Sequence, residues 1–382
     1  MSIVYVINGD GKTVPMKQVH CKNEEKELQQ LLESNPQLMP GDQIRPHDPL
    51  RWLLIKREMP VPDPSSGEDR WSIDHFFVDQ SAIPTFVECK RFLDTRSRRE
   101  VLGQMLDYAA NGHWYWDRES IRNYAADTCK ERGIELEEAL KSLAPDVDGA
   151  DEFLEQVENN LREGQIRMVF FMEEAPQELK SIVDFLNKQM ERSEILIVEA
   201  KQFESGGLKV VAPSLFGFTE EARRVKRTVT VTTASGSGRR KWNEALFFEA
   251  AQGSLETNAI DALRKLYDFL SEQEVTLRWG DGKIHGSYNC VLEEICPRAM
   301  FTVNTAGQIY FNFGYITGSE KAEAFCEELA GTLMNKLGFN LPEDFREKYP
   351  SIKPADWVPK VVVLIDQLKS IFDSVRAGNA DA

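Results

Sequence analysis

The chain has 382 residues, of which 62 are acidic and 46 are Lys or Arg, so its formal net charge at neutral pH is −16. This length predicts about two or three domains, and the negative charge argues against a protein that coats nucleic acid through a uniformly basic surface, because Lys and Arg contacts to phosphate supply non-specific affinity. No apolar run approaches the roughly 20 residues that span a bilayer, and no charged segment precedes a long apolar one at the N-terminus, so we expect a cytoplasmic protein.

The cysteines and glycines exclude several other chemistries. The cysteines stand at positions 21, 89, 129, 290, 296 and 326 and form neither a C-x-x-C pair nor a cluster with histidine. This spacing predicts reduced, scattered thiols rather than a zinc site or a disulfide framework. No glycine-rich phosphate loop with its lysine is present either, so activity coupled to nucleotide hydrolysis would need a partner.

The first elements along the chain are one helix and three strands. We expect the helix at 24–33 and the strands at 51–56, 72–78 and 84–90. Apolar and polar residues mostly alternate over 72–78, whereas 84–90 is an apolar run rich in Thr, Phe and Val. The polar residues 79–82 between the last two strands are suited to a turn, so these strands should pair antiparallel and bring Asp74 towards Glu88, fourteen positions later.

The predicted hairpin presents two carboxylates and an amine. Residues i and i+2 of a strand face the same side, so Glu88 and Lys90 should project together while Cys89 faces away. Hard cations such as Mg²⁺ prefer oxygen ligands and keep several waters, which suits two carboxylates and a substrate phosphate. Asp74 and Glu88 are therefore candidate ligands of Mg²⁺ or Mn²⁺, and Lys90 is placed to orient a water or to stabilise a phosphorane. The predicted reaction is phosphodiester hydrolysis.

The segment 96–110 has helical periodicity and carries two further candidates. Gln104 and Tyr108 are four residues apart, so they lie on one face of this helix. Either both reach the same cleft, which the pattern favours, or Tyr108 takes part in ordinary helix packing.

With Asp74, the Glu88-Cys89-Lys90 triplet and the Gln104-x-x-x-Tyr108 spacing, the chain resembles the PD-(D/E)xK nuclease superfamily, in particular its RecB-like branch with a Q-x-x-x-Y helix motif. The resemblance implies an αβββαβ restriction-endonuclease-like core, catalytic roles for Asp74, Glu88 and Lys90, and auxiliary roles for Gln104 and Tyr108. DNA rather than RNA as substrate rests on the same resemblance.

The resemblance also implies smaller details of the metal site. The backbone carbonyl of Cys89 would complete the metal's ligand shell. An acidic residue of the first helix often supports such a site, and Glu25 is the choice here, with Glu24 next. One departure is that Ile73 stands where the superfamily name has proline, which leaves the carboxylate at position 74 unchanged.

The rest of the first domain extends this core. The charged, helix-periodic stretch 117–163 predicts a helical insertion, and the strand 166–172, helix 177–190 and strand 195–198 form a parallel crossover. A second triplet, Glu199-Ala200-Lys201, follows that last strand. No aspartate occupies a hairpin position before it, so we interpret it as structural. The nuclease-like domain is predicted at 1–215.

Two basic clusters are candidates for phosphate contacts. The first follows the triplet and includes Arg91, Arg96, Arg98 and Arg99. The second lies in a Ser/Gly-containing linker predicted at 216–241 and includes Arg223, Arg224, Lys226, Arg227, Arg239, Arg240 and Lys241. The first cluster either contacts nucleic acid or is a solvated face of the protein. The second cluster either contacts nucleic acid or is a solubilising linker.

The segment 242–382 predicts a separate α+β domain for substrate recognition, oligomerisation or regulation. Helices are expected at 243–251, 256–272, 319–337 and 358–372, and strands at 275–279, 286–291, 300–304 and 308–313. Aromatic residues on these strands either pack in the core of the sheet, which the pattern favours, or stack on unpaired bases. They are Trp279, Tyr288, Phe301, Tyr310 and Phe313.

Taken together, these patterns predict a magnesium- or manganese-dependent deoxyribonuclease acting on duplex DNA, in genome defence or DNA processing. A homodimer and a protein activator are compatible with this prediction. Two alternatives stay open: a nucleic-acid-binding or assembly protein that uses an inactive nuclease fold, and a conditionally activated nuclease specific for RNA or for a nucleic-acid structure.

Overall fold

The computed structural model describes every residue except 1–3, 8, 10, 46–48, 63–68, 92–97, 145–148, 218–241, 281–284, 317–318, 348 and 381–382; at 62, 69–70, 98–100, 113, 347 and 377–380 the side chains are not described. The chain divides into two compact units, one of Met1–Arg45 with Leu50–Val229 and one of Pro46–Pro49 with Thr230–Ala382. The division falls inside the predicted linker 216–241.

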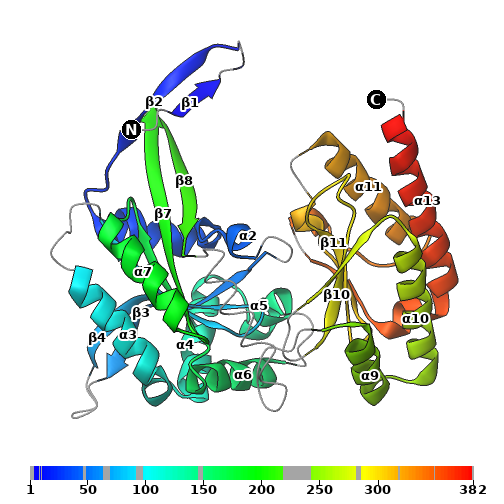
Figure 1. Cartoon of the computed structure of the whole chain (residues 1–382), viewed down its shortest axis with the longest axis horizontal. Coiled ribbons are helices and arrows are strands. Elements are labelled where there is room, and N and C mark those ends of the chain that lie inside the picture. The colour runs from blue at the N-terminus through cyan, green and yellow to red at the C-terminus, as the bar shows by residue number, and fades with distance from the viewer. Residues whose placement is uncertain are drawn as a thin grey trace. The chain divides into compact units, whose positions relative to one another are not determined.

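The first unit is built around an eight-stranded mixed sheet (Figure 1). Its strands are β1 (Val4–Ile7), β2 (Thr13–Val19), β3 (Trp52–Pro62), β4 (Asp69–Asp79), β5 (Pro84–Lys90), β6 (Arg167–Met172), β7 (Glu194–Ser205) and β8 (Leu208–Phe216). They are ordered β1-β2-β7-β6-β5-β4-β3, with β8 paired to β7. Strands β3, β4 and β5 are antiparallel neighbours, whereas β5, β6 and β7 run parallel. This unit is therefore an α/β fold.

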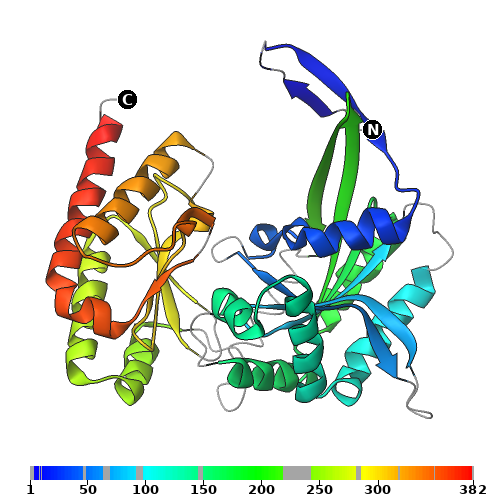
Figure 2. The same cartoon turned by 180° about the vertical axis from the view of Figure 1, so that it is seen from behind.

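Helices cover both faces of the sheet (Figures 1 and 2). One face packs against the N-terminal helical segment, which consists of a π-helical turn (Glu25–Gln29), α1 (Gln30–Ser34), a 3-10 turn (Pro36–Leu38) and α2 (Gly41–Ile44). The opposite face packs against α3 (Arg98–Tyr115), α4 (Arg118–Glu131), α5 (Leu136–Leu143), α6 (Ala150–Arg162) and α7 (Gln177–Gln189). Because β5 and β6 are covered on both sides, nearly all of their residues are buried, which explains their continuous apolar sequences.

Helices α4, α5 and α6 occupy the charged stretch 117–163, where the sequence predicted helices. Asp117 caps α4 by accepting a hydrogen bond from the Ser120 N–H at 2.8 Å. The apolar stripes of these helices face the sheet: Ile121, Leu140 and Phe153 are all buried in the core that contains β4 and β5. These helices therefore support the β4–β5 hairpin from one side.

Several elements differ from the prediction. The helix expected at 24–33 begins as a π-helical turn, which no local pattern distinguishes from an α-helix. The strand expected at 195–198 extends through Ser205 and returns as β8, because Gly206 and Gly207 adopt positive φ angles of 56° and 85° and permit a tight turn. The sequence patterns do not predict β1, β2 and β8, whose mostly exposed or half-buried positions lack the apolar run of an interior strand.

The second unit is a five-stranded antiparallel sheet with helices, as the sequence predicted for 242–382. The order is β13-β12-β11-β10-β9. The strands are β9 (Thr276–Trp279), β10 (Ser287–Val291), β11 (Ala299–Asn304), β12 (Ile309–Phe311) and β13 (Ser351–Ile352). The main helices are α9 (Glu244–Ser254), α10 (Thr257–Glu272), α11 (Glu320–Asn335) and α13 (Val361–Ala380), with a short α12 (Pro354–Trp357). Strand β13 has two residues and was not predicted.

The aromatic residues of the second sheet pack in its core. Tyr288, Phe301 and Phe313 are at most 2% exposed, and Trp279 is partly buried against the same cluster. Tyr310 is 7% exposed. The packing interpretation of these aromatic residues is therefore confirmed.

Two further observations bear on the sequence predictions. All six cysteines are free thiols in buried positions. Among the helices that the structure describes, none combines the length and the apolar character needed to cross a membrane.

Candidate functional site

The β4–β5 hairpin brings Asp74 to Glu88, as the sequence predicted. The register pairs His75 with Val87 and Phe76 with Phe86, so Asp74 lies at the next position along β4 and faces the end of β5. The backbone N–H of Cys89 donates to Asp74 Oδ2 at 2.6 Å. This short bond fixes the Asp74 carboxylate against the triplet.

Glu88 and Lys90 project from the same face of β5. Lys90 Nζ lies 3.1 Å from Glu88 Oε1. Glu88 is only 6% exposed, and among the described residues its second oxygen, Oε2, is buried and accepts no hydrogen bond. A buried carboxylate oxygen without a donor is energetically costly, and such an oxygen is available to a cation or a water.

Cys89 points to the other face of β5 and is fully buried there. Its Sγ lies 3.9 Å from His75 Nδ1. His75 is also fully buried, and its Nε2 lies 2.9 Å from the carbonyl oxygen of Gln29. Because a carbonyl only accepts hydrogen bonds, Nε2 is the protonated nitrogen. Burial lowers the pKa of His75 to about 3, so the ring is neutral and links β4 to the N-terminal helical segment.

The π-helical turn Glu25–Gln29 and the residue that precedes it, Glu24, supply two more side chains to the site. A π-helix closes hydrogen bonds between residues i and i+5, as the Gln30 N–H does with the carbonyl of Glu25. Residues five apart therefore lie on nearly the same side, whereas in an α-helix of 3.6 residues per turn they would be about 140° apart. In this way Glu24 and Gln29 both face the hairpin.

Glu24 and Gln29 bind different members of the site. Glu24 Oε1 lies 3.3 Å from Lys90 Nζ, and its Oε2 accepts the backbone N–H of Arg91 at 3.0 Å. Gln29 Nε2 donates to Asp74 Oδ1 at 2.7 Å. The sequence favoured Glu25 for this part of the site, but Glu25 is exposed and its neighbour Glu24 makes the contact to Lys90.

The charges in the site are strongly coupled. Burial, reinforced by the charge of Glu88, raises the pKa of Asp74 to about 7. Burial also raises the pKa of Glu88, against the opposing effect of Lys90. Burial alone would favour a neutral Lys90 amine, but the carboxylates of Glu88, Asp74 and Glu24 raise its pKa above the ordinary value. Lys90 is therefore a cation at neutral pH. The pKa values of the neighbouring Asp74 and Glu88 carboxyl groups are raised, and a further cation bound beside them would lower these pKa values.

This coupling predicts a pH dependence of stability in the metal-free protein. The folded Asp74 carboxyl keeps its proton up to about pH 7, whereas the unfolded one releases it near its ordinary pKa of 3.8. The folded state thus binds more protons between these values, so the contribution of Asp74 to the free energy of unfolding is full below about pH 4 and is lost as the pH rises through about 7.

Melting temperatures of the wild type and Asp74→Asn, measured in chelator across this pH range, test the prediction. We expect the wild type to lose stability relative to Asp74→Asn as the pH rises, because the variant lacks the titrating group. A difference between the two proteins that stays constant or moves the opposite way would contradict the assigned environment of Asp74.

Helix α3 places Tyr108 close to this site. Tyr108 is 2% exposed, and its hydroxyl donates to the carbonyl of Ser72 on β4 at 3.4 Å. Burial raises its pKa, and the charges of Glu88 and Asp74 add to this effect. Gln104 lies one turn earlier on α3 and is half-buried. The predicted Gln104–Tyr108 helix therefore packs beside the hairpin.

The predicted basic residues are only partly described. Arg91 donates from Nη1 to the carbonyl of Lys22 at 3.0 Å, which ties the end of β5 to the segment before the π-helical turn. Arg98 and Arg99 lie at the start of α3, but their side chains are not described. Arg96 lies outside the described residues, as do Arg223, Arg224, Lys226, Arg227, Arg239, Arg240 and Lys241.

The second triplet has a structural role. Glu199 Oε1 accepts the backbone N–H of Ala175 at 2.8 Å and lies 2.9 Å from Lys180 Nζ. These contacts hold the start of α7 against β7, which agrees with the interpretation of Glu199-Ala200-Lys201 as structural.

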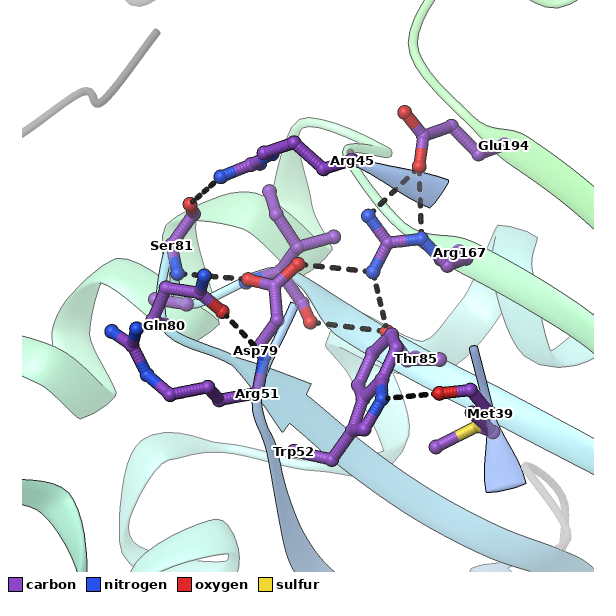
Figure 3. Close-up of polar contacts among 12 residues, drawn as sticks. Met39, Arg45, Arg51, Trp52, Asp79, Gln80, Ser81, Thr85, Arg167 and Glu194 are labelled. Atoms are coloured by element: carbon purple, nitrogen blue, oxygen red, sulfur yellow. Dashed lines mark hydrogen bonds and ion pairs between the residues drawn. The ribbon is translucent and has the colours of Figure 1, made fainter. Parts of the chain in front are cut away.

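A buried ionic network fixes the opposite end of the hairpin (Figure 3). Arg167, only 1% exposed, donates to Asp79 Oδ2 at 3.0 Å, to Thr85 Oγ1 at 3.1 Å and to Glu194 at 2.9 Å. The other oxygen of Asp79 accepts the N–H groups of Ser81 and Ile83 at 2.8 and 3.1 Å. This network ties β4, β5, β6 and β7 together and sets the turn on which the Asp74–Glu88 register depends.

The residues that sequence reasoning missed are Gln29 and His75, and it ranked Glu24 second. Their positions depend on the π-helical turn and on long-range packing, which leave no recognisable spacing in the sequence. The acidic run at the start of the first helix was the only available signal, and it pointed to Glu24 as well as Glu25.

The donor set at this end of the hairpin suits a hard divalent cation. Asp74 and Glu88 offer carboxylate oxygens, one of them buried without a hydrogen bond, and the carbonyl of Cys89 directly follows Glu88 in the chain. No group of three His, Cys, Asp or Glu side chains within the described part of the chain is arranged to hold a metal, so a third protein ligand would come from an amide or a backbone carbonyl.

Comparisons with protein-family models, with curated proteins and with solved structures each give no match to this chain.

Proposed function

We propose that this protein is a metal-dependent nuclease that hydrolyses phosphodiester bonds of DNA. The observation that carries the proposal is the convergence of Asp74, Glu88 and Lys90 at one end of the β4–β5 hairpin, where Lys90 bonds Glu88 at 3.1 Å and Asp74 accepts the Cys89 N–H at 2.6 Å. Burial raises the pKa of both Asp74 and Glu88, so a divalent cation that stabilises their charged forms is favoured there, and the protonated Lys90 beside them favours a phosphate.

Each residue has a defined role in this proposal. Asp74, Glu88 and the carbonyl of Cys89 would hold Mg²⁺ or Mn²⁺. The ion, when bound, would polarise the phosphoryl oxygen and lower the pKa of an attacking water. Lys90 is held protonated by the surrounding carboxylates, so it serves as a cation that stabilises negative charge developing on the phosphate rather than as a general base.

The surrounding elements support the comparison with PD-(D/E)xK nucleases. The helical segment before β3, the antiparallel strands β3, β4 and β5, helix α3 and the parallel strand β6 follow one another in the αβββαβ order of that superfamily. In this proposal the helices α4 to α6 are the insertion, and Gln104 and Tyr108 on α3 lie near the nucleic-acid backbone.

A panel of nucleic acids tests the proposed function. The purified full chain is incubated with linear, nicked and closed circular DNA and with RNA, under Mg²⁺, Mn²⁺ or chelator. Metal-dependent release of mononucleotides from linear ends would indicate an exonuclease, and linearisation of closed circles an endonuclease. Cleavage of RNA alone would support the RNA-directed alternative. Metal-independent cleavage, or no cleavage of any substrate, would contradict the proposal, and binding without cleavage would favour the scaffold alternative.

The structure also distinguishes the two acidic residues of the first helix. We expect Glu24→Ala to lower metal-dependent cleavage by roughly 10-fold or more, the effect typical of residues that orient a metal site, because Glu24 binds Lys90 and the N–H of Arg91. Initial cleavage rates of Glu24→Ala and Glu25→Ala, measured side by side, check this. A larger loss in Glu25→Ala would show that Glu25, not Glu24, supports the metal site.

A further inference from the structure

Only one of the two polar atoms of the Gln29 amide forms a hydrogen bond. Its Nε2 donates to Asp74 Oδ1 at 2.7 Å, while its Oε1 is buried and accepts no hydrogen bond from the described residues. Gln29 is 8% exposed, so bulk solvent does not compensate this oxygen. A buried amide oxygen without a donor is costly. Glu88 Oε2 is also buried without a hydrogen-bond donor, and the two oxygens together indicate that the site lacks an electropositive group.

The distance between the Gln29 amide and Asp74 Oδ1, 2.7 Å, is also close to that expected between two oxygens that bind one cation. Ligand oxygens at roughly 2.0–2.1 Å and right angles around an octahedral ion such as Mg²⁺ lie about 2.9 Å apart. Rotation of the terminal amide by half a turn exchanges Nε2 and Oε1, and terminal torsions of glutamine have two broad minima that permit it. The amide oxygen would then lie 2.7 Å from Asp74 Oδ1, in place of the present donor.

The backbone around Gln29 holds the side chain in place for either orientation. Its carbonyl accepts the buried His75 N–H at 2.9 Å, and the π-helical turn directs the side chain at the hairpin. An amide rotation therefore requires no movement of the helix or of β4.

We propose that Gln29 is a switchable ligand of the site. Without a divalent cation its N–H stabilises Asp74, and with one its amide turns so that Oε1 becomes a third side-chain ligand beside Asp74 and Glu88. The ligand is a hard, oxygen-preferring divalent cation. The inference rests on the proposed function, because it assumes that Asp74 and Glu88 bind the ion.

Direct binding of Mn²⁺ tests this inference without reference to cleavage. Free Mn²⁺ is measured by electron paramagnetic resonance during titration of the full chain as wild type, Gln29→Ala, Gln29→Glu and Gln30→Ala. Gln30 is the exposed neighbour and serves as the control. We expect Gln29→Ala to weaken Mn²⁺ binding by roughly 10–100-fold, Gln29→Glu to bind at least as tightly as the wild type, and Gln30→Ala to match it.

The outcomes separate the inference from the proposed function. If Gln29→Ala binds Mn²⁺ as tightly as the wild type or more tightly, the Gln29 amide only competes with the ion for Asp74. The inference about Gln29 is then wrong, but the metal site at Asp74 and Glu88 is still supported. If Gln29→Glu binds no better than Gln29→Ala, position 29 is not a ligand position. If the wild type itself binds no Mn²⁺, the proposed function fails with it. Circular dichroism melting in chelator shows whether each variant is folded. If Gln29→Ala is not folded, the Mn²⁺ affinity of Gln29→Glu, which keeps the length of the side chain, decides whether position 29 is a ligand.

Discussion

Asp74→Asn should abolish metal-dependent cleavage while leaving the fold intact. Asn keeps the size of the side chain and can still accept the Cys89 N–H that now bonds Asp74 at 2.6 Å, but it removes the negative charge that would bind the cation. A catalytic metal supplies several kcal/mol of transition-state stabilisation, so the cleavage rate should fall by at least about 10³-fold. Initial rates on the best substrate of the panel, with Mg²⁺ and with Mn²⁺, provide the measurement.

The matched control is Asp151→Asn on α6. Asp151 is an exposed carboxylate whose ion pair with Arg122 lies on the surface, where such pairs contribute little to stability. We expect this variant to cleave at the wild-type rate. Metal-dependent cleavage that persists in Asp74→Asn would place the active site elsewhere in the chain.

The largest effect on stability is expected for Arg167→Met. This change retains most of the side-chain volume but leaves Asp79 and Glu194 without the guanidinium that joins them in the buried network of Figure 3. Removing one partner of a buried ionic network costs about 3–5 kcal/mol, because the remaining charges stay desolvated. Backbone amides of β5 that exchange only when this unit unfolds should therefore exchange with solvent at least roughly 10²–10³-fold faster than in the wild type, because about 1.4 kcal/mol corresponds to a factor of ten.

Hydrogen–deuterium exchange measured by mass spectrometry over β4 and β5 gives this number directly. Arg122→Met serves as the control, since Arg122 pairs with Asp151 at the surface. Protection of β5 that is unchanged in Arg167→Met would mean that apolar packing, not the network, fixes the hairpin.

The same substitution connects the two ends of the hairpin. Asp79 and Asp74 lie on one strand, and the register His75–Val87 follows from the turn that Asp79 and Arg167 hold. A slip of one residue would turn Glu88 and Lys90 to the opposite face of β5. A residue remote from the site can therefore determine whether the site assembles.

Much of the architecture was predictable because it follows from local patterns. The hairpin strands and strands β9 to β12 of the second unit were predicted close to their observed bounds, and helices were predicted over the first part of α3 and across 117–163, since apolar periodicity and turn residues report directly on burial. Strands β1, β2 and β8 were missed because their positions are mostly exposed or half-buried, and the distal part of β7 was missed because polar residues interrupt its apolar run; these segments are stabilised by pairing with one another.

The sequence by itself determined the hairpin, the common face of Glu88 and Lys90, and the approach of Asp74 to them, because strand periodicity and a short turn suffice to place these three side chains. Only the tertiary structure decided that Glu24 rather than Glu25 contacts Lys90, that Gln29 binds Asp74, and that Lys90 stays protonated. These features depend on a π-helical turn that changes which residues share a helix face and on burial that couples neighbouring charges. Both arise from packing between segments distant in sequence, which no local pattern encodes.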